Sequence, residues 1–388
     1  MTDPLPQPVA LPTIVREWGR IGMIGFGGPP AHIALIRRLC VEDRRWLTEH
    51  EFEDGIAATS LLPGPASTQL AIYCAWRLRG VTGAVIGGIS FILPGLVVIL
   101  GLSAVFLSAD PPQWILGVAA GSGAAVPAVA VSAAVGLIPA SWQRAGAARA
   151  ARVRWMVYLL AGGAAAATVG AYLVLVLVLC GVIEITVRTG SGGPGRRNLP
   201  AMVPAAMVPV VTGGIAALSW VAFKVGALSY GGGFVIIPLM QHDAVVTYHW
   251  MTGAQFLNAV ALGQVTPGPV VQTVAVVGYA ASGLWGGLLA SAIAFAPSFA
   301  FVIVGARHFD RIRDDRRVRA FFVGAGSAVI GAIGGSAIPL GLELTRLWQL
   351  GVLALAAVSL VALRRGTVLT LVGAGAIGLI AVLAGAPA

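Results

Sequence analysis

Five long apolar stretches constrain the fold of this chain more than any other feature of its sequence. They cover residues 82–108, 113–140, 155–187, 284–306 and 367–386. Each is long enough to cross a bilayer, which takes about 20 helical residues. Only 10% of the 388 residues are charged, whereas soluble domains carry about 25% charged residues. We therefore predict an all-α polytopic protein of the lipid bilayer, with roughly 10–13 membrane segments.

Several motifs of enzymes and metal proteins are absent from the sequence. Lys224 is the single lysine and follows Phe223, so the chain has no phosphate-binding G-K-[ST] loop. The five histidines form no H-E-x-x-H motif, and the three cysteines form no C-x-x-C pair. We expect no enzymatic activity, no cofactor, no metal site and no nucleic-acid partner. Any work that the protein does must then be driven by a gradient or by a partner.

Basic residues gather in short clusters between the apolar stretches. Cytoplasmic loops of membrane proteins carry an excess of Lys and Arg. We therefore expect six clusters to face the cytoplasm: 37–45, 77–79, 144–154, 188–197, 307–319 and 364–365. The stretch 54–76 lies between the first two clusters, so it must enter and leave the membrane on one side. It is predicted to be a re-entrant hairpin that breaks at Pro63-Gly64-Pro65.

The two halves of the sequence repeat each other. A shift of 204 residues aligns the following: Gly27-Gly28 with Gly231-Gly232, Trp46 with Trp250, and Pro63-Gly64-Pro65 with Pro267-Gly268-Pro269. Such self-similarity indicates a duplicated unit. We infer two homologous repeats, residues 1–190 and 205–388. They are joined by a linker, residues 191–204, whose Gly and Pro content is typical of a loop.

Equivalent loops of the two repeats carry opposite charge signals. The segment 37–45 has four arginines, whereas its counterpart 241–249 has no Lys or Arg. The segment 307–319 has six arginines, whereas its counterpart near 104–116 has none. If positive loops face the cytoplasm, the repeats are inserted upside down relative to each other, a recurring design among secondary transporters. A parallel duplication whose loops have drifted is the alternative.

Broken helices recur at matching positions of the two repeats, around the glycine motifs and the Pro-Gly-Pro turns. Proline interrupts a helix but is well tolerated as the first residue of the next one, whose free N–H groups attract anions. Within a membrane, non-helical backbone is tolerated only where it is buried in protein or lines a cavity. We therefore predict that the substrate binds around these breaks, at Gly27, Gly28, Gly231, Gly232, Pro63, Gly64, Pro65, Ser67, Thr68, Gln69, Gln264, Thr266, Pro267, Gly268 and Pro269. In the alternative reading, the glycines only allow close helix packing and the polar side chains only satisfy the broken backbone.

Two cations are also related by the repeat, because the same shift places Arg20 on Lys224. Two cations related by an inverted pseudo-twofold axis could approach one dianion from opposite sides. Arg20 is equally well explained as one more cytoplasmic arginine. Lys224 lies away from the cytoplasm in the inverted topology, and a cation near the bilayer centre costs about 2.5–3.5 kcal/mol. It should therefore be retained for a ligand or for a partner carboxylate.

The ordered set of motifs resembles the chromate ion transporter family over nearly the whole chain. The resemblance rests on Phe26-Gly27-Gly28-Pro29, Arg45-Trp46-Leu47, Leu62-Pro63-Gly64-Pro65, Phe91-Ile92-Leu93-Pro94-Gly95 and Gly263-Gln264-Val265-Thr266-Pro267-Gly268-Pro269. It implies export of chromate across the bacterial inner membrane and chromate resistance, with sulfate as a structural analogue of the substrate. Asn258 departs from the pattern, because the resemblance leads us to expect an acidic residue there. For the assembly we consider a homodimer.

Three other functions remain open at this stage. A sulfate or other oxyanion permease differs from the leading hypothesis only in its substrate. An anion channel differs in mechanism, since re-entrant half-helices also build channel filters. A membrane-embedded enzyme is disfavoured, because no paired nucleophile and base is visible in the sequence.

Overall fold

The computed structural model describes residues 9–62, 64–168, 172–190, 213–229, 234, 236–305 and 315–387. The predictions on Pro63, Gly231, Gly232, the linker 191–204 and most of the cluster 307–319 lie outside these residues. Within them, every regular element is helical, as the sequence predicts. Four helical stretches in the described part are long and apolar enough to cross a membrane: Ala66–Phe106, Gln113–Ala145, Val270–Gly305 and Arg316–Leu342. The chain thus has the character of a helical membrane protein.

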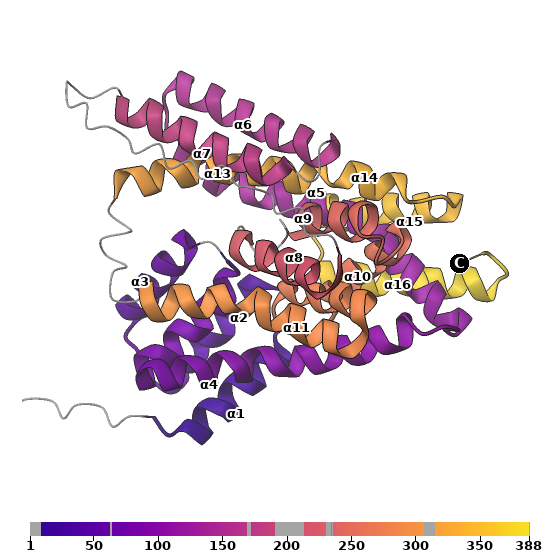
Figure 1. Ribbon diagram of the computed structural model, residues 1–388, viewed down its shortest axis with the longest axis horizontal. Coiled ribbons are helices and arrows are strands. Elements are labelled where there is room, and N and C mark those ends of the chain that lie inside the picture. The colour runs from indigo at the N-terminus through magenta and orange to yellow at the C-terminus, as the bar shows by residue number, and fades with distance from the viewer. Residues whose placement is uncertain are drawn as a thin grey trace, which may run out of the picture.

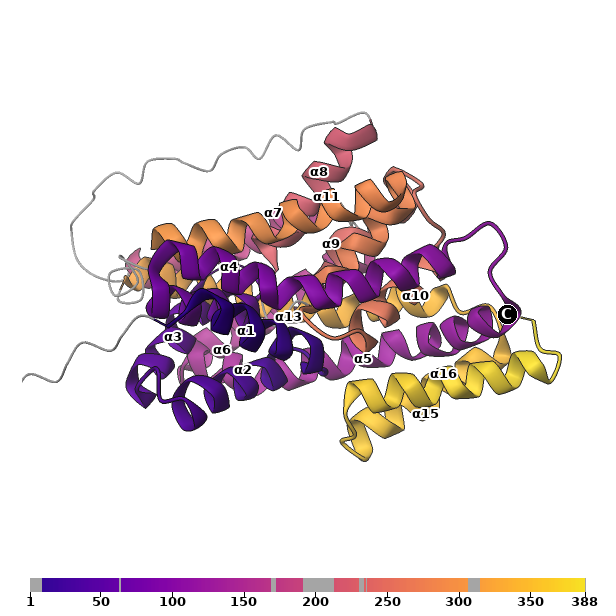
Figure 2. The ribbon, with the colours of Figure 1, turned by 90° about the horizontal axis from the view of Figure 1, so that it is seen from below.

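The longest helices lie along the long axis of the molecule (Figures 1 and 2). The elements of the first half are α1 (Leu11–Ile24), α2 (Pro29–Arg37), η1 (Arg38–Asp43), α3 (Glu49–Leu61), α4 (Ala66–Phe106), α5 (Gln113–Ala145), α6 (Arg149–Thr168) and α7 (Leu173–Gly190). Those of the second half are α8 (Gly214–Leu228), α9 (Ile236–Gln241), η3 (His242–Thr247), α10 (Gly253–Val265), η4 (Val270–Gln272), α11 (Thr273–Gly305), α13 (Arg316–Gly335), α14 (Ala337–Leu342), α15 (Leu347–Ala357), η5 (Val358–Ala362) and α16 (Thr367–Leu383).

Helix α4 consists of two helical segments that fold back on each other. The backbone leaves the helical region at Arg79 and Gly80, and Gly80 has a φ of +60°. After this turn Gly88 packs against Ile72, so the second segment runs antiparallel to the first. Glycine is suited to this position because a positive φ carries no Cβ penalty.

Helix α3 pairs with the first segment of α4. Gly55 of α3 contacts the side chains of Leu70 and Tyr73, so the chain reverses direction between the two helices. The reversal lies between Leu61 and Ala66, the stretch in which the sequence predicts a break. A Thr48 cap fixes the start of α3, because its hydroxyl accepts the N–H of Glu51 and the Glu51 carboxylate accepts the N–H of Thr48.

Local structures recur in the second half at the spacing of the sequence repeat. The π-helix η1 has its counterpart in η3, and the capping box of α3 has its counterpart in Thr252 and Gln255 of α10. The turn within α4 recurs within α11 at Ser282 and Gly283. Close backbone contact recurs as well, because Gly22 packs on Phe91 and Gly226 packs on Ala294.

The equivalent helices α4 and α11 pack side by side and run in opposite directions (Figures 1 and 2). Gly88 lies against Phe299, and Leu100 lies against Gly287. Residue numbers therefore rise along one helix as they fall along the other. In Figure 2, α4 ends on the right, where the chain continues into α5, and α11 ends on the left.

A second group of helices, α6, α7 and α13, packs through small residues. Gly162 and Gly331 each approach the backbone of the facing helix, at Ala328 and Leu159 respectively. Small residues let the helix backbones approach closely. Such packing matters in a membrane because the surrounding lipid is as apolar as the side chains and provides no hydrophobic driving force for helix association. These helices share a core with the end of α5, which Trp155 and Ile333 help to fill. The group forms the upper layer in Figure 1.

Glu184 joins α6 to α7 and is expected to be required for stability. Its carboxylate is 2% exposed and accepts hydrogen bonds from Arg154 at 2.8 Å and from Arg188 at 2.6 Å. Hydrogen bonds to charged groups contribute about 1.5–3 kcal/mol each, and the two arginines that would lose them are only 27% and 35% exposed. Glu184→Gln should therefore lower the melting temperature of the purified protein in detergent. Exposed Glu42, for which the described residues provide no ion pair, supplies the control Glu42→Gln; equal melting temperatures of both variants would contradict this role.

Candidate functional site

The broken segments of the two halves interlock through reciprocal backbone hydrogen bonds. The N–H of Gly64 donates to the carbonyl oxygen of Ser229 at 2.8 Å, and the N–H of Gly268 donates to that of Gly25 at 3.1 Å. Both pairs join a Pro-Gly-Pro turn of one half to the glycine motif of the other. Because Gly64 matches Gly268 and Gly25 matches Ser229 in the sequence repeat, the two contacts are equivalent. The breaks are thus brought together at the contact between the halves.

Polar side chains beside these turns are buried. Ser67, Thr68 and Gln69 follow the first turn at the start of α4 and are at most 2% exposed. Gln264 and Thr266 precede the second turn at the end of α10 and are 7% and 5% exposed. Burying polar groups costs free energy unless they are hydrogen-bonded, so their partners decide what this region can do.

Some of these groups find partners within the protein. Thr266 Oγ1 donates to the carbonyl oxygen of Leu262 at 2.8 Å. Gln272 Nε2, on the short helix η4, donates to the carbonyl oxygen of Ile92 at 2.6 Å and so links the two halves. For these donors, satisfaction of the broken backbone is the observed role.

Other buried polar atoms have no hydrogen-bond partner among the described residues. Around the breaks these are Thr68 Oγ1, Ser229 Oγ, Gln264 Nε2, Gln272 Oε1 and Ser298 Oγ. An unsatisfied buried polar group costs about 1–3 kcal/mol. The hydroxyl groups of Thr68, Ser229 and Ser298 and the amide N–H of Gln264 are donors that could each bond to an oxygen of a bound species. The arrangement therefore fits an oxyanion better than a cation, because hydroxyl and amide N–H groups can donate to it.

His32 is a site residue that sequence reasoning missed. It lies in α2, directly after the glycine motif, and is fully buried. Its Nε2 donates to the carbonyl oxygen of Gly25 at 2.9 Å, and its Nδ1 lies 3.2 Å from Ser67 Oγ. His32 thus ties the glycine motif of the first half to the start of α4. Its position just after a break was the available signal.

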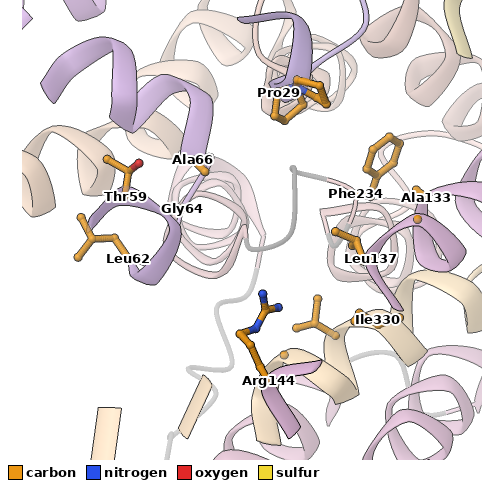
Figure 3. A pocket seen from close by; sticks show the side chains of 14 residues that line it. Pro29, Thr59, Leu62, Gly64, Ala66, Ala133, Leu137, Arg144, Phe234 and Ile330 are labelled. Atoms are coloured by element: carbon orange, nitrogen blue, oxygen red, sulfur yellow. The ribbon is translucent and has the colours of Figure 1, made fainter. Parts of the chain in front are cut away.

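A cavity of about 430 Å³ opens beside the first break. It is lined by Pro29, Pro30, Thr59, Leu62, Gly64, Ala66, Ala133, Gly136, Leu137, Arg144, Phe234, Gly326, Val329 and Ile330. Figure 3 shows these residues converging from several helices around a common space. Its walls are largely apolar, and they come from α2, α3, α4, α5 and α13.

The predicted glycines and prolines lie at the ends of helices. Gly27 and Gly28 have φ values of +95° and +77°, and Gly28 is the residue before α2. Pro65 immediately precedes α4, and Pro269 immediately precedes η4. Pro267 packs closely on Gly95 of α4. The structure therefore groups the described part of the predicted set around the two interlocked turns.

The two predicted cations each lie beside a carboxylate. Arg20 on α1 is 70% exposed and lies 4.0 Å from Glu17. Lys224 on α8 is 14% exposed, and its Nζ lies 2.5 Å from the carboxylate of Asp243 in η3. Neither cation lines the cavity. The partner carboxylate that the sequence allowed for Lys224 is therefore present.

Comparison with known proteins places the chain among transporters. The family model "Chromate transporter" matches residues 12–185 and 216–379. A chromate transport protein of Cupriavidus metallidurans is 32% identical over 337 residues, which are 84% of this chain and 82% of that protein. One of Pseudomonas aeruginosa is 30% identical over 352 residues, 87% and 83% of the two chains. A probable chromate transport protein of Synechococcus elongatus is 27% identical over 344 residues, 86% and 85%.

No solved structure matches the chain significantly. The family match nevertheless covers most of both halves, and it includes both Pro-Gly-Pro turns and the described glycines of the site. On these grounds the chain is a member of the chromate transporter family.

Proposed function

We propose that this protein is a secondary transporter that exports chromate from the bacterial cytoplasm across the inner membrane and so confers chromate resistance. The observation that carries the proposal is the reciprocal contact of the two broken segments, Gly64 with Ser229 and Gly268 with Gly25. Beside the breaks lie buried donors for which the described residues provide no hydrogen-bond partner. The names of the relatives in Cupriavidus and Pseudomonas support chromate as the substrate.

The proposed architecture is a pair of inverted repeats. It is supported by the antiparallel packing of the equivalent helices α4 and α11. The family model matches two successive regions whose first residues, 12 and 216, are separated by the shift of the sequence repeat. In this arrangement α3 and the first segment of α4 form a re-entrant hairpin, and α10 with the start of α11 forms its inverted counterpart. Both halves contribute to the site, so one chain suffices to build it.

The donors at the breaks are proposed to replace the hydration shell of the oxyanion. Thr68 and Ser298 provide hydroxyl groups, and Gln264 provides an amide N–H. The first segment of α4 begins at Ala66, so its free N–H groups and the positive end of its dipole add to the attraction. Such a site favours a tetrahedral oxyanion by its hydrogen bonds and needs no bound cofactor.

Export of a dianion is expected to be driven by the membrane potential alone. Moving one charge through 100 mV is worth about 2.3 kcal/mol, so a dianion that leaves an inside-negative cell gains about 4.6 kcal/mol per 100 mV. Chromate uptake into inverted membrane vesicles should therefore slow when the potential is collapsed. Dissipating the pH gradient alone serves as the control and should leave the flux unchanged. If collapsing the potential has no effect, coupling to protons or another ion must replace electrogenic export.

The substrate assignment is tested by competition in cells. Cells that express the chain should accumulate less radiolabelled chromate than cells that do not. Excess sulfate should reduce this difference only at concentrations well above those of chromate. Equal accumulation in both cell types, or export of sulfate in preference to chromate, would contradict chromate export.

A further inference from the structure

The cavity beside the first break is lined by one charged side chain from the described part of the chain. Among its fourteen described lining residues, Arg144 is the only charged one and none carries a carboxylate. Arg144 lies in the last turn of α5, and Figure 3 shows its guanidinium directed into the space that the other side chains surround. The remaining walls are mostly aliphatic, with Thr59 as the other polar side chain. A positive charge between apolar walls produces a stronger local field than one on an open surface.

Arg144 has no ion pair or hydrogen bond within the described residues, and it is exposed. Nearby Arg154 and Arg188 are both held by Glu184. Arg152 lies over the ring of Trp142 at 5.2 Å. The charge of Arg144 is therefore available to a solute, whereas those of Arg152, Arg154 and Arg188 are engaged by other side chains.

The cavity also leads to the interlocked turns. Leu62, Gly64 and Ala66 line it, and Gly64 is the residue that donates to Ser229. A Cβ built on Gly64 would lie 3.2 Å from Ser298 Oγ and would collide with the amide of Gln69. The cavity thus reaches from exposed Arg144 to Gly64, which lies beside the buried hydroxyl of Ser298 at the break.

We propose that this cavity is the cytoplasmic access vestibule of the transporter and that Arg144 captures the tetrahedral dianion before it reaches the break. The inference rests on the proposed function and deepens it by naming the residue that recruits the substrate. A guanidinium can donate two parallel hydrogen bonds to two oxygens of such an anion. Phe234 and Val329, from the second half of the chain, line the cavity together with residues of the first half. The anion therefore enters between the two halves.

Initial rates of chromate uptake into inverted vesicles provide the test, because their outer face is the cytoplasmic one. In Arg144→Gln the chromate concentration for half-maximal uptake should rise about tenfold, the scale of electrostatic steering. The maximal rate should change little, because the groups at the break remain. Arg149→Gln is the matched control, since Arg149 belongs to the same basic cluster and is exposed but does not line the cavity. It should behave as the wild type.

Chemical restoration of the charge provides a second readout. The three native cysteines are buried, so the new thiol of Arg144→Cys is the accessible target of an impermeant thiol reagent. A reagent that attaches an ammonium group should lower the chromate concentration for half-maximal uptake back toward that of the wild type. A reagent that attaches a sulfonate should not restore it. Wild-type vesicles treated with each reagent control for effects on native thiols.

The outcomes separate the two proposals. If wild-type vesicles carry chromate and Arg144→Gln behaves as Arg149→Gln does, the vestibule is wrong and the transport function stands. The same conclusion follows if ammonium and sulfonate groups at position 144 have equal effects. If wild-type vesicles carry no chromate, the proposed function itself fails.

Discussion

Replacing Gly64 or Gly268 with leucine is expected to abolish chromate transport while leaving the protein inserted in the membrane. Both glycines have positive φ values, +127° and +95°, which L residues rarely adopt. A side chain at Gly64 would displace the amide of Gln69, and a Cβ at Gly268 would lie 3.2 Å from Gln272 Oε1. We expect a loss of about 100-fold or more, because displacing positioning groups by about 1 Å has costs of this order.

Gly146→Leu separates backbone strain from the site itself. Gly146 has a φ of +100°, close to that of Gly268, but no atom lies within 4 Å of a Cβ built on it. It should retain transport at matched expression in the same vesicle assay. If the Gly64 and Gly268 variants also transport chromate normally, the Pro-Gly-Pro turns serve only packing.

Lys224→Ala is the second substitution from which we expect a large loss of transport. Its ammonium group contacts Asp243 at 2.5 Å and lies 5.8 Å from the ring centre of Trp220. Removal of the lysine leaves the largely buried Asp243 carboxylate unpaired, which costs about 3–5 kcal/mol. We expect chromate binding and transport to weaken strongly. Lys224→Arg should retain part of both, because the charge remains while the geometry changes.

A double variant distinguishes a structural ion pair from a cation that the substrate needs. In Lys224→Ala with Asp243→Ala no buried charge is left unpaired, so insertion and melting temperature should recover. Transport should stay low if the ammonium group also attracts the dianion. Full transport by the double variant, or by Lys224→Ala alone at matched expression, would remove Lys224 from the site. Arg20→Ala, assayed in the same way, tests the pseudo-symmetric cation and should weaken transport.

Much of the local structure could be predicted from sequence because it depends on neighbouring residues. Apolar length indicates the helices, and proline next to Gly64 indicates the break between α3 and α4. The motifs that start α3 and α10, at Thr48 and Thr252, are recognisable capping boxes. Each of these signals lies within a few residues of the structure that it specifies.

The contacts that build the site could not be predicted in this way. The pairing of Gly64 with Ser229 joins residues from different halves, and the sequence pattern does not say which broken segment meets which. Arg144 lies within a basic cluster, so its direction into a cavity depends on the packing of α5 against α13. The same limit applies to Asp243 as the partner of Lys224, because a carboxylate on η3 is selected by tertiary packing alone.

Counterflow of labelled chromate in liposomes that contain the purified chain tests chromate transport by a carrier most directly. Liposomes loaded with unlabelled chromate should transiently accumulate labelled chromate above its equilibrium level, because an alternating-access carrier exchanges one for the other. Liposomes with Gly64→Leu should show no such accumulation. Uptake without transient accumulation, together with single-channel currents, would show a channel instead. No uptake beyond that of protein-free liposomes would contradict chromate transport altogether.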